Sequence, residues 1–281
     1  MNTRRFEAMN TSWWVRCDRS VLLDGVEPWV EEVEARLSRF LDDSALSRLN
    51  RTRSAEDAIL AGVTRAALEM AEATGGAFDP TLGGQLAALG YDRSFEKIDR
   101  PTVERRREGD DGAPLAVHLE GDRVELHGDG ELDLGGIAKG WTIDRVVERL
   151  RSSGAESVLV DAGGDLRGTG RPWPIGLEAG PVVELTGAAI ATSSRRRRRW
   201  ASAGGEEFHH ILDPETGQSA DSPLAEVTVI AGEAATADAL ATALLVAPDR
   251  LLPQLDRWEA RAAVRSADGD WWTTSNWKEA S

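Results

Sequence analysis

The sequence has little cysteine, and it lacks long apolar runs. Cys17 is its single cysteine, which excludes an internal disulfide and leaves at most one soft ligand for a metal site. No apolar run reaches the roughly 18 residues of a membrane span. The first twenty residues also lack the uninterrupted apolar core of a secretion signal. We therefore expect a cytoplasmic protein with no membrane span, or an exported one if a leader has been removed.

Positive charge is scarce, since 33 basic residues face 48 acidic ones and the formal net charge is -15. Because binding to a phosphate backbone needs a basic face, this balance argues against a nucleic-acid partner. An anionic substrate would need a local positive site. Only three of the basic residues are lysines, Lys97, Lys139 and Lys278, which directs attention to Lys139.

The composition is typical of a globular protein, with 41% hydrophobic residues and ten tryptophans. Apolar residues at helical spacing predict that two helices open the chain, over 28–43 and 55–76. The charged stretch over 94–114 predicts a loop. Alternation around Gly121-Asp122 predicts a hairpin over 115–134.

The second half of the chain mixes strand-like and helical patterns. A helix is predicted over 143–150, a strand followed by a helix over 225–246, and a closing hairpin over 260–274. Further short strands are expected over 157–163, 173–180, 182–187 and 188–194. Groups of strands separated by helices favour an α+β fold over a regular parallel βαβ sheet. The length of 281 residues fits one large domain or two modest ones.

Four glycine-marked turns each contain an aspartate: 74–84, 132–140, 160–170 and 209–217. Glycines allow the backbone to approach a ligand and to expose N–H groups to a phosphate. Taken singly, each turn is more often explained as a plain turn with Asx-type hydrogen bonds. Four such turns in one chain favour a ligand site.

Lys139 begins the amphipathic pattern that includes Ile143 and Leu150. A lysine beside exposed amides at a helix start could bind a phosphate, or it could be a solvated surface residue. Asp133, in the preceding turn, could bind a ligand hydroxyl or cap the turn. The spacing alone leaves both pairs of alternatives open.

Asp238 and Thr242 are four residues apart, so they share one face of the predicted helix. Their oxygens suit Mg²⁺, which binds few protein groups and keeps positions for phosphate or water. The alternative is structural: an aspartate near a helix start is favoured by the helix dipole, and a helical threonine often bonds its own backbone.

His209 and His210 would point to opposite faces of a strand, so one of them at most faces a given site. That residue could be a general base, or both could be structural. The run Arg195 to Arg199 could bind phosphate or an acidic partner, but a solvated loop or strand edge is the interpretation favoured by the sequence.

Eight segments occur in the order typical of one family: FEAMNTSW, SALSRLN, GGAFDPTLG, LDLGGIAKGWTIDRV, VDAGGDLRGTG, IATSS, HHILDPETG and TADALATAL. The chain thereby resembles the ApbE family of FAD:protein FMN transferases from about residue 6 to 246. The resemblance implies a single α+β domain over 1–281, related to the tunnelling fold, with mixed, mainly antiparallel sheets and packed helices. It also implies Mg²⁺-dependent transfer of FMN from FAD to a threonine or serine of a target protein, with release of AMP.

The resemblance also assigns roles to residues at matching positions. FAD would be bound by Met9, Ala77, Phe78, Asp79, Asp133, Lys139 and Ile211. Mg²⁺ would be held by Asp238, Thr242 and the backbone of Gly136, and catalysis would use Asp238 together with His210 as the base. The sequence departs from the family at Asn10, where glycine is usual, and at Ala241, where some members carry a further acidic ligand. An FAD pyrophosphatase and a non-catalytic FAD-binding protein are the competing functions.

Overall fold

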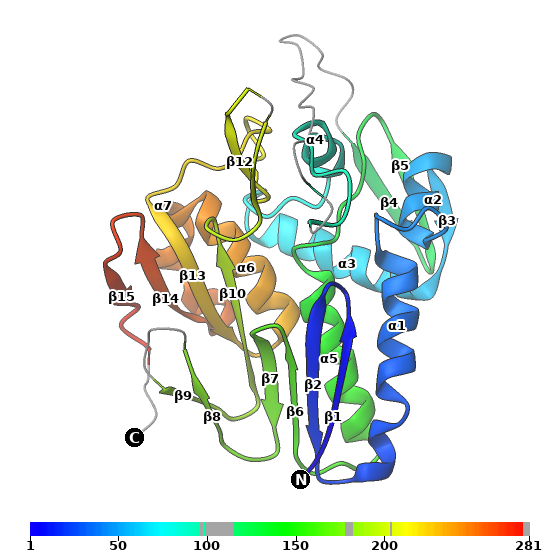
Figure 1. Cartoon of the computed structure of the whole chain (residues 1–281), viewed down its shortest axis with the longest axis vertical. Coiled ribbons are helices and arrows are strands. Elements are labelled where there is room, and N and C mark those ends of the chain that lie inside the picture. Colours follow the sequence, from blue (N-terminus) through cyan, green and yellow to red (C-terminus); the bar gives the residue numbers. More distant parts are fainter. Residues whose placement is uncertain (96–97, 99–114, 178–181, 203, 278–281) are drawn as a thin grey trace.

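The computed structural model describes residues 1–95, 98, 115–177, 182–202 and 204–277. Its centre is an eight-stranded sheet in the order β1-β2-β6-β7-β10-β13-β14-β15, with every neighbouring pair antiparallel (Figure 1). The strands are β1 (Asn2–Ala8), β2 (Thr11–Cys17), β6 (Val158–Ala162), β7 (Asp165–Thr169), β10 (Ala188–Ser194), β13 (Leu224–Ala231), β14 (Arg261–Ser266) and β15 (Trp271–Thr273). This arrangement confirms the predicted α+β fold with antiparallel sheets.

The chain opens with the β1–β2 hairpin, so the prediction that two helices open the chain is wrong. The two strands pair from Asn2↔Cys17 to Ala8↔Thr11, which leaves Met9 and Asn10 as a two-residue turn. Both have positive φ, 53° and 58°. That combination is typical of a type I′ turn, whose twist matches that of the flanking strands. The hairpin is hard to predict because the first four residues of β1 are all exposed and show no alternation.

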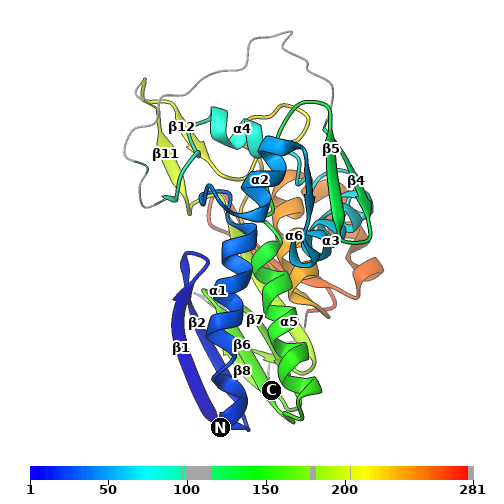
Figure 2. The ribbon, with the colours of Figure 1, turned by 90° about the vertical axis from the view of Figure 1, so that its right-hand side faces the viewer.

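Helices cover one face of the sheet (Figure 2). They are α1 (Val26–Leu37), α3 (Ala58–Ala73), α5 (Ala138–Ser152) and α6 (Ala234–Val246). The predicted helix over 28–43 ends early, at Leu37, because Ser38 has extended backbone while its N–H still bonds to the carbonyl of Glu34. Phe40 and Leu41 therefore lie outside the helix, and Leu41 is exposed. The other three predicted helices are confirmed, with α5 longer than 143–150.

Helices α5 and α6 are locked together at one end. A Cβ at Gly140 of α5 would lie 2.4 Å from the carbonyl oxygen of Ala234, so only glycine permits this approach. Next to it, the buried Asp144 carboxylate accepts hydrogen bonds from the backbone N–H groups of Ala234 and Ala235, both at 2.9 Å. It also pairs with Arg167 of β7 at 2.7 Å. An α5 side chain thus caps the first turn of α6.

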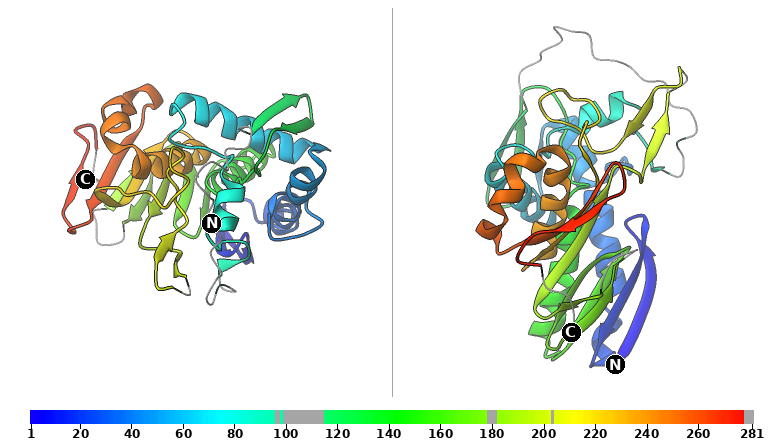
Figure 3. Two further views of the ribbon diagram at one scale, coloured as in Figure 1. Left: turned by 90° about the horizontal axis from the view of Figure 1, so that it is seen from above. Right: turned by 90° about the vertical axis from the view of Figure 1, so that its left-hand side faces the viewer.

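Smaller elements surround this framework (Figure 3). The small sheets are β3-β5-β4, β8-β9 and β11-β12, built from β3 (Ser54–Glu56), β4 (Ala116–Glu120), β5 (Arg123–His127), β8 (Trp173–Gly176), β9 (Val182–Leu185), β11 (Arg199–Ala201) and β12 (Glu207–His209). The short helices are η1 (Ser20–Leu23), α2 (Ala45–Thr52), α4 (Gly83–Ala88), α7 (Pro248–Leu251) and η3 (Leu252–Trp258). The predicted hairpins over 115–134 and 260–274 are confirmed as β4–β5 and β14–β15.

The β11–β12 hairpin stands close to α4, above the large sheet in Figure 1. Trp200 joins the two, because its indole N–H donates to the carbonyl of Leu89 at 2.7 Å and its ring lies 5.4 Å from that of Tyr91. The predicted loop over 94–114 lies mostly outside the described residues. Across the described ranges, no helix combines the length and the apolar character that crossing a membrane requires.

Candidate active site

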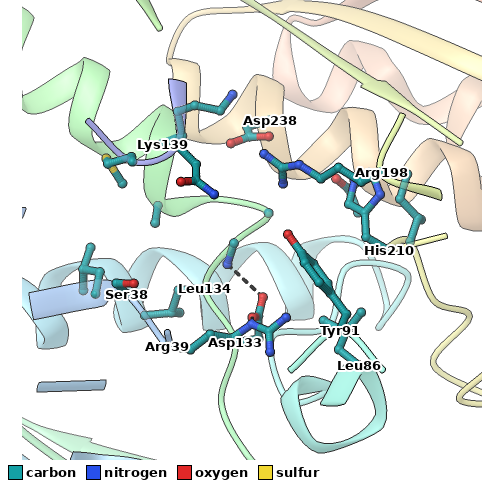
Figure 4. A pocket seen from close by; sticks show the side chains of 18 of the residues that line it. Ser38, Arg39, Leu86, Tyr91, Asp133, Leu134, Lys139, Arg198, His210 and Asp238 are labelled. Atoms are coloured by element: carbon teal, nitrogen blue, oxygen red, sulfur yellow. Dashed lines mark hydrogen bonds and ion pairs between the residues drawn. The ribbon is translucent and has the colours of Figure 1, made fainter. Parts of the chain in front are cut away.

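A cavity of about 560 Å³ lies where segments distant in the sequence converge. Its walls come from the β1–β2 turn, the segment after α1, the segment before α4, the turn into α5, the end of β10, the segment after β12 and one face of α6. Figure 4 shows Lys139, Asp238, Arg198 and His210 on one side and Arg39, Asp133 and Tyr91 on the other. The volume is within the range of small-ligand sites, which is about 300 to 1,000 Å³.

All of the predicted site residues line this one cavity. They are Met9, Ala77, Phe78, Asp79, Asp133, Gly136, Lys139, His210, Ile211, Asp238 and Thr242. They come from five separate parts of the chain, so their meeting is a property of the fold and not of local sequence. Their individual roles remain predictions.

One face of α6 supplies the oxygen atoms that could hold a metal. Asp238 is 7% exposed, and its carboxylate accepts a long hydrogen bond of 3.4 Å from the N–H of Gly140. The Thr242 hydroxyl lies 3.1 Å from the Ser193 hydroxyl. A Cβ at Gly136 would lie 3.7 Å from the Thr242 hydroxyl, so the Gly136 backbone is close to it. Burial raises the pKa of Asp238, an effect that the charge of Lys139 opposes. A divalent cation beside this carboxylate would also lower its pKa.

Lys139 occupies the first turn of α5 and forms an ion pair with Asp165 of β7. The Asp165 carboxylate is itself held by the N–H of Thr192 at 3.0 Å. Burial lowers the pKa of Lys139, and the carboxylates of Asp238 and Asp161 oppose that shift. The surface alternative for Lys139 is therefore excluded, since its ammonium group lies inside a cavity among three carboxylates.

The two histidines differ in position. His209 ends β12 away from the cavity, with its Nε2 3.2 Å from the carbonyl oxygen of Ala220. His210 lines the cavity, and its Nδ1 is buried without a hydrogen-bond partner in the described part of the chain. Burial, reinforced by the charge of Arg198, lowers the pKa of His210 to about 3. The imidazole is therefore neutral near pH 7 and free to accept a proton.

Asp133 is held by a residue that the sequence analysis missed. Its carboxylate pairs with Arg39 at 2.6 Å and accepts the N–H of Gly135 at 2.9 Å. The Arg39 guanidinium lies over the rings of Phe40 and Tyr91, at 4.5 and 4.6 Å from their centroids. Asp133 thus both caps its turn and faces the cavity. Arg39 carries no sequence signal, whereas Tyr91 is the single tyrosine of the chain and could have been singled out.

Comparisons with known proteins show what the chain is similar to. The model of the ApbE family matches residues 9–263. The FAD:protein FMN transferase of Vibrio cholerae is 32% identical over 252 residues, which cover 82% of this chain and 74% of that protein. The corresponding transferase of Haemophilus influenzae is 30% identical, covering 79% and 71%.

Solved structures are similar along nearly the whole chain. The ApbE protein from Thermotoga maritima superposes with a TM-score of 0.83 at 28% identity, covering 98% of this chain and 97% of that one. The apo flavinyl transferase ApbE of Pseudomonas stutzeri has a TM-score of 0.80 at 27% identity, covering 98% and 96%. The chain described here therefore belongs to the ApbE family.

Proposed function

We propose that this protein is an FAD:protein FMN transferase that moves FMN from FAD to a threonine or serine hydroxyl of a target protein, with Mg²⁺ bound and AMP released. The observation that carries the proposal is the convergence of Lys139, His210, Asp238 and Thr242 on one cavity. The names of the relatives support it, since they are called FAD:protein FMN transferases.

The donors around Asp238 fit Mg²⁺ better than a softer metal. In the described part of the chain, no three His, Cys, Asp or Glu side chains gather as a metal-binding group. One carboxylate, the Thr242 hydroxyl and the backbone at Gly136 form an oxygen-only set, which leaves positions for phosphate oxygens and water. When bound there, Mg²⁺ would neutralise charge on the transferring phosphoryl group.

His210 is the residue placed to take the proton of the acceptor hydroxyl. Its neutral imidazole lines the cavity and can accept a proton, and its Nδ1 has no hydrogen-bond partner in the described residues. Negative charge on a bound diphosphate would raise the pKa of His210 from its value of about 3 and so strengthen the base. The remaining work is positioning, because phosphoryl transfer depends mainly on alignment and electrostatic stabilisation.

Lys139 and Asp133 would orient the substrate. Lys139 offers a half-buried positive charge to a phosphate oxygen, and its ion pair with Asp165 fixes the direction of the ammonium group. Asp133 is held in place by Arg39, so its carboxylate can accept a hydrogen bond from a ligand hydroxyl without reorganising.

The test is to incubate the protein with FAD, Mg²⁺ and a target that carries an acceptor threonine, and to measure the mass of the target. We expect covalent FMN on the target, and none when Mg²⁺ is chelated or when the acceptor threonine is changed to valine. AMP release at the same rate without any target would instead indicate an FAD pyrophosphatase. FAD binding without turnover, unchanged in Asp238→Ala, would indicate a non-catalytic flavin-binding protein.

A further inference from the structure

The run Arg195 to Arg199 divides into residues that hold the loop and residues that face the cavity. Arg195 donates to the carbonyl of Ala220 at 3.1 Å, Arg196 donates to the carbonyl of Ala267 at 3.0 Å, and Arg199 pairs with Glu207 at 2.5 Å. Only Arg197 and Arg198 line the cavity. The solvated-loop interpretation therefore does not describe Arg198, which is half-buried.

The backbone at Arg198 is held in a sparsely populated conformation. Its φ is +47°, in the left-handed region that non-glycine residues seldom adopt. Such strain persists where the surrounding structure enforces it, and it gathers at ligand-binding sites. Here it turns the chain immediately before β11 begins at Arg199. In Figure 4 the Arg198 guanidinium points into the cavity toward the Asp238 carboxylate.

The charge of Arg198 acts on the centre of the cavity. It contributes to lowering the pKa values of Lys139, His210 and Asp238, so it lies within electrostatic reach of all three. The Arg198 side chain has no ion-pair partner within the residues that the structure describes. Arg198 and Lys139 both act on the Asp238 carboxylate, so two cations lie near the same part of the cavity, and two cations together favour a ligand with more than one negative charge.

We propose that Arg198 binds the diphosphate of FAD, together with Lys139. The assignment rests on the proposed function, since it takes FAD to be the ligand of this cavity. A guanidinium donates two parallel hydrogen bonds to phosphate oxygens, which the ammonium group of lysine cannot match. Arg198 therefore makes the cavity selective for a flavin that carries a diphosphate over the same flavin without phosphate.

The experiment measures binding of FAD and of riboflavin, by flavin fluorescence, with divalent metals chelated so that no transfer occurs. Arg198→Ala is expected to weaken FAD binding by about 10- to 100-fold, the range for hydrogen bonds to charged groups, and to leave riboflavin binding unchanged. Arg198→Lys should show an intermediate loss. Inorganic pyrophosphate should displace FAD from the unaltered protein and act much more weakly on Arg198→Ala.

Arg199→Ala is the matched control, because Arg199 belongs to the same run but pairs with Glu207 outside the cavity. It should bind FAD like the unaltered protein. The assignment is overturned if Arg198→Ala binds FAD unchanged, if it loses FAD and riboflavin equally, or if Arg199→Ala loses as much. If the unaltered protein binds no FAD at all, the proposed function fails as well, so the two failures are distinguishable.

Discussion

At the scale of single residues, substitutions of His210 and of its neighbour His209 can show whether proton transfer requires a histidine that lines the cavity. The two are adjacent, and burial lowers both pKa values, to about 3 and about 4, but only His210 lines the cavity. We expect His210→Gln to slow FMN transfer by about 100-fold or more, the usual contribution of general base catalysis, with FAD affinity nearly unchanged. His209→Gln should transfer FMN at close to the normal rate. Single-turnover labelling of the target measures both, and equal rates in the two variants would contradict the role of His210.

The site residues that could be predicted from the sequence are those whose relation to one another is local, and the residues that were missed depend on long-range contacts. Asp238 and Thr242 could be predicted because four-residue spacing on a helix is a local property. Arg39 could not, because its contact with Asp133 joins parts of the chain nearly a hundred positions apart. The same holds for Arg198, which lies between β10 and β11, whereas its neighbours Lys139 and Asp238 come from the helices α5 and α6.

At the scale of elements, the contact between α5 and α6 sets the distance between Lys139 and Asp238. Gly140→Ala would place a methyl group 2.4 Å from the carbonyl oxygen of Ala234. We expect the free energy of unfolding to fall by about 1 to 3 kcal/mol, the usual cost of overpacking, and FMN transfer to fall with it. Gly25→Ala is the control, since no atom lies within 4 Å of its added Cβ. Urea denaturation of both variants checks this, and an equally stable Gly140→Ala would contradict the contact.

Asp144, whose carboxylate caps α6 at the same contact, should make the stability of the protein depend on pH. Burial raises its pKa from 3.8 to about 6, although Arg167 and the N–H groups of Ala234 and Ala235 oppose the shift, and Glu233 adds to it. Between these values the folded protein binds more protons than the unfolded chain, so this group adds stability as the pH falls from about 6 to below 4. The raised pKa of Asp144 corresponds to roughly 2 to 3 kcal/mol in the free energy of unfolding.

Asp144→Asn removes this titration. The free energy of unfolding of the unaltered protein, minus that of the variant, should therefore be larger at pH 4 than at pH 7 by that amount. Taking the difference cancels the titration of all other groups that the substitution leaves unchanged. Urea denaturation at both pH values measures it, and a difference independent of pH would show that the pKa of Asp144 is not raised.

Elements with a buried face were predicted well, and elements without one were not. The apolar stripe of α1 at Val26, Val30, Val33 and Leu37 is visible in the sequence, yet Phe40 and Leu41 continue it past the true end of the helix. The extended backbone at Ser38 decides that end, and no residue pattern announces it. The opening hairpin could not be predicted for a different reason. The first half of β1 is exposed, so it has no apolar face whose alternation would indicate a strand.

At the scale of the whole molecule, the order of strands could not be read from the sequence. β2 pairs with β6, although about 140 residues separate them, and β1 and β15 form the two edges of the same sheet. Such pairings depend on long-range packing, whereas hairpins follow from local turn chemistry. Because one sheet includes strands from near both ends of the described chain, it supports the single domain that the family resemblance implies, which stays a prediction.

The cavity joins the first hairpin to α6, so its ligands should stabilise the protein as a whole. A ligand present at a hundred times its dissociation constant adds about 2.7 kcal/mol to the free energy of unfolding. We expect FAD alone to raise the melting temperature, and Mg²⁺ to raise it further in the presence of FAD, because the metal would contact both the diphosphate and the Asp238 carboxylate. Asp238→Asn should keep the increase with FAD alone and lose the further increase with Mg²⁺.

Thermal unfolding in the absence of a target protein measures the two increments separately. Glu206→Gln is a suitable control, since it removes one carboxylate outside the cavity lining and changes the net charge equally. Its two increments should match those of the unaltered protein. If Asp238→Asn retained the full Mg²⁺ increment, the metal would bind elsewhere, and α6 would serve the fold without holding the metal.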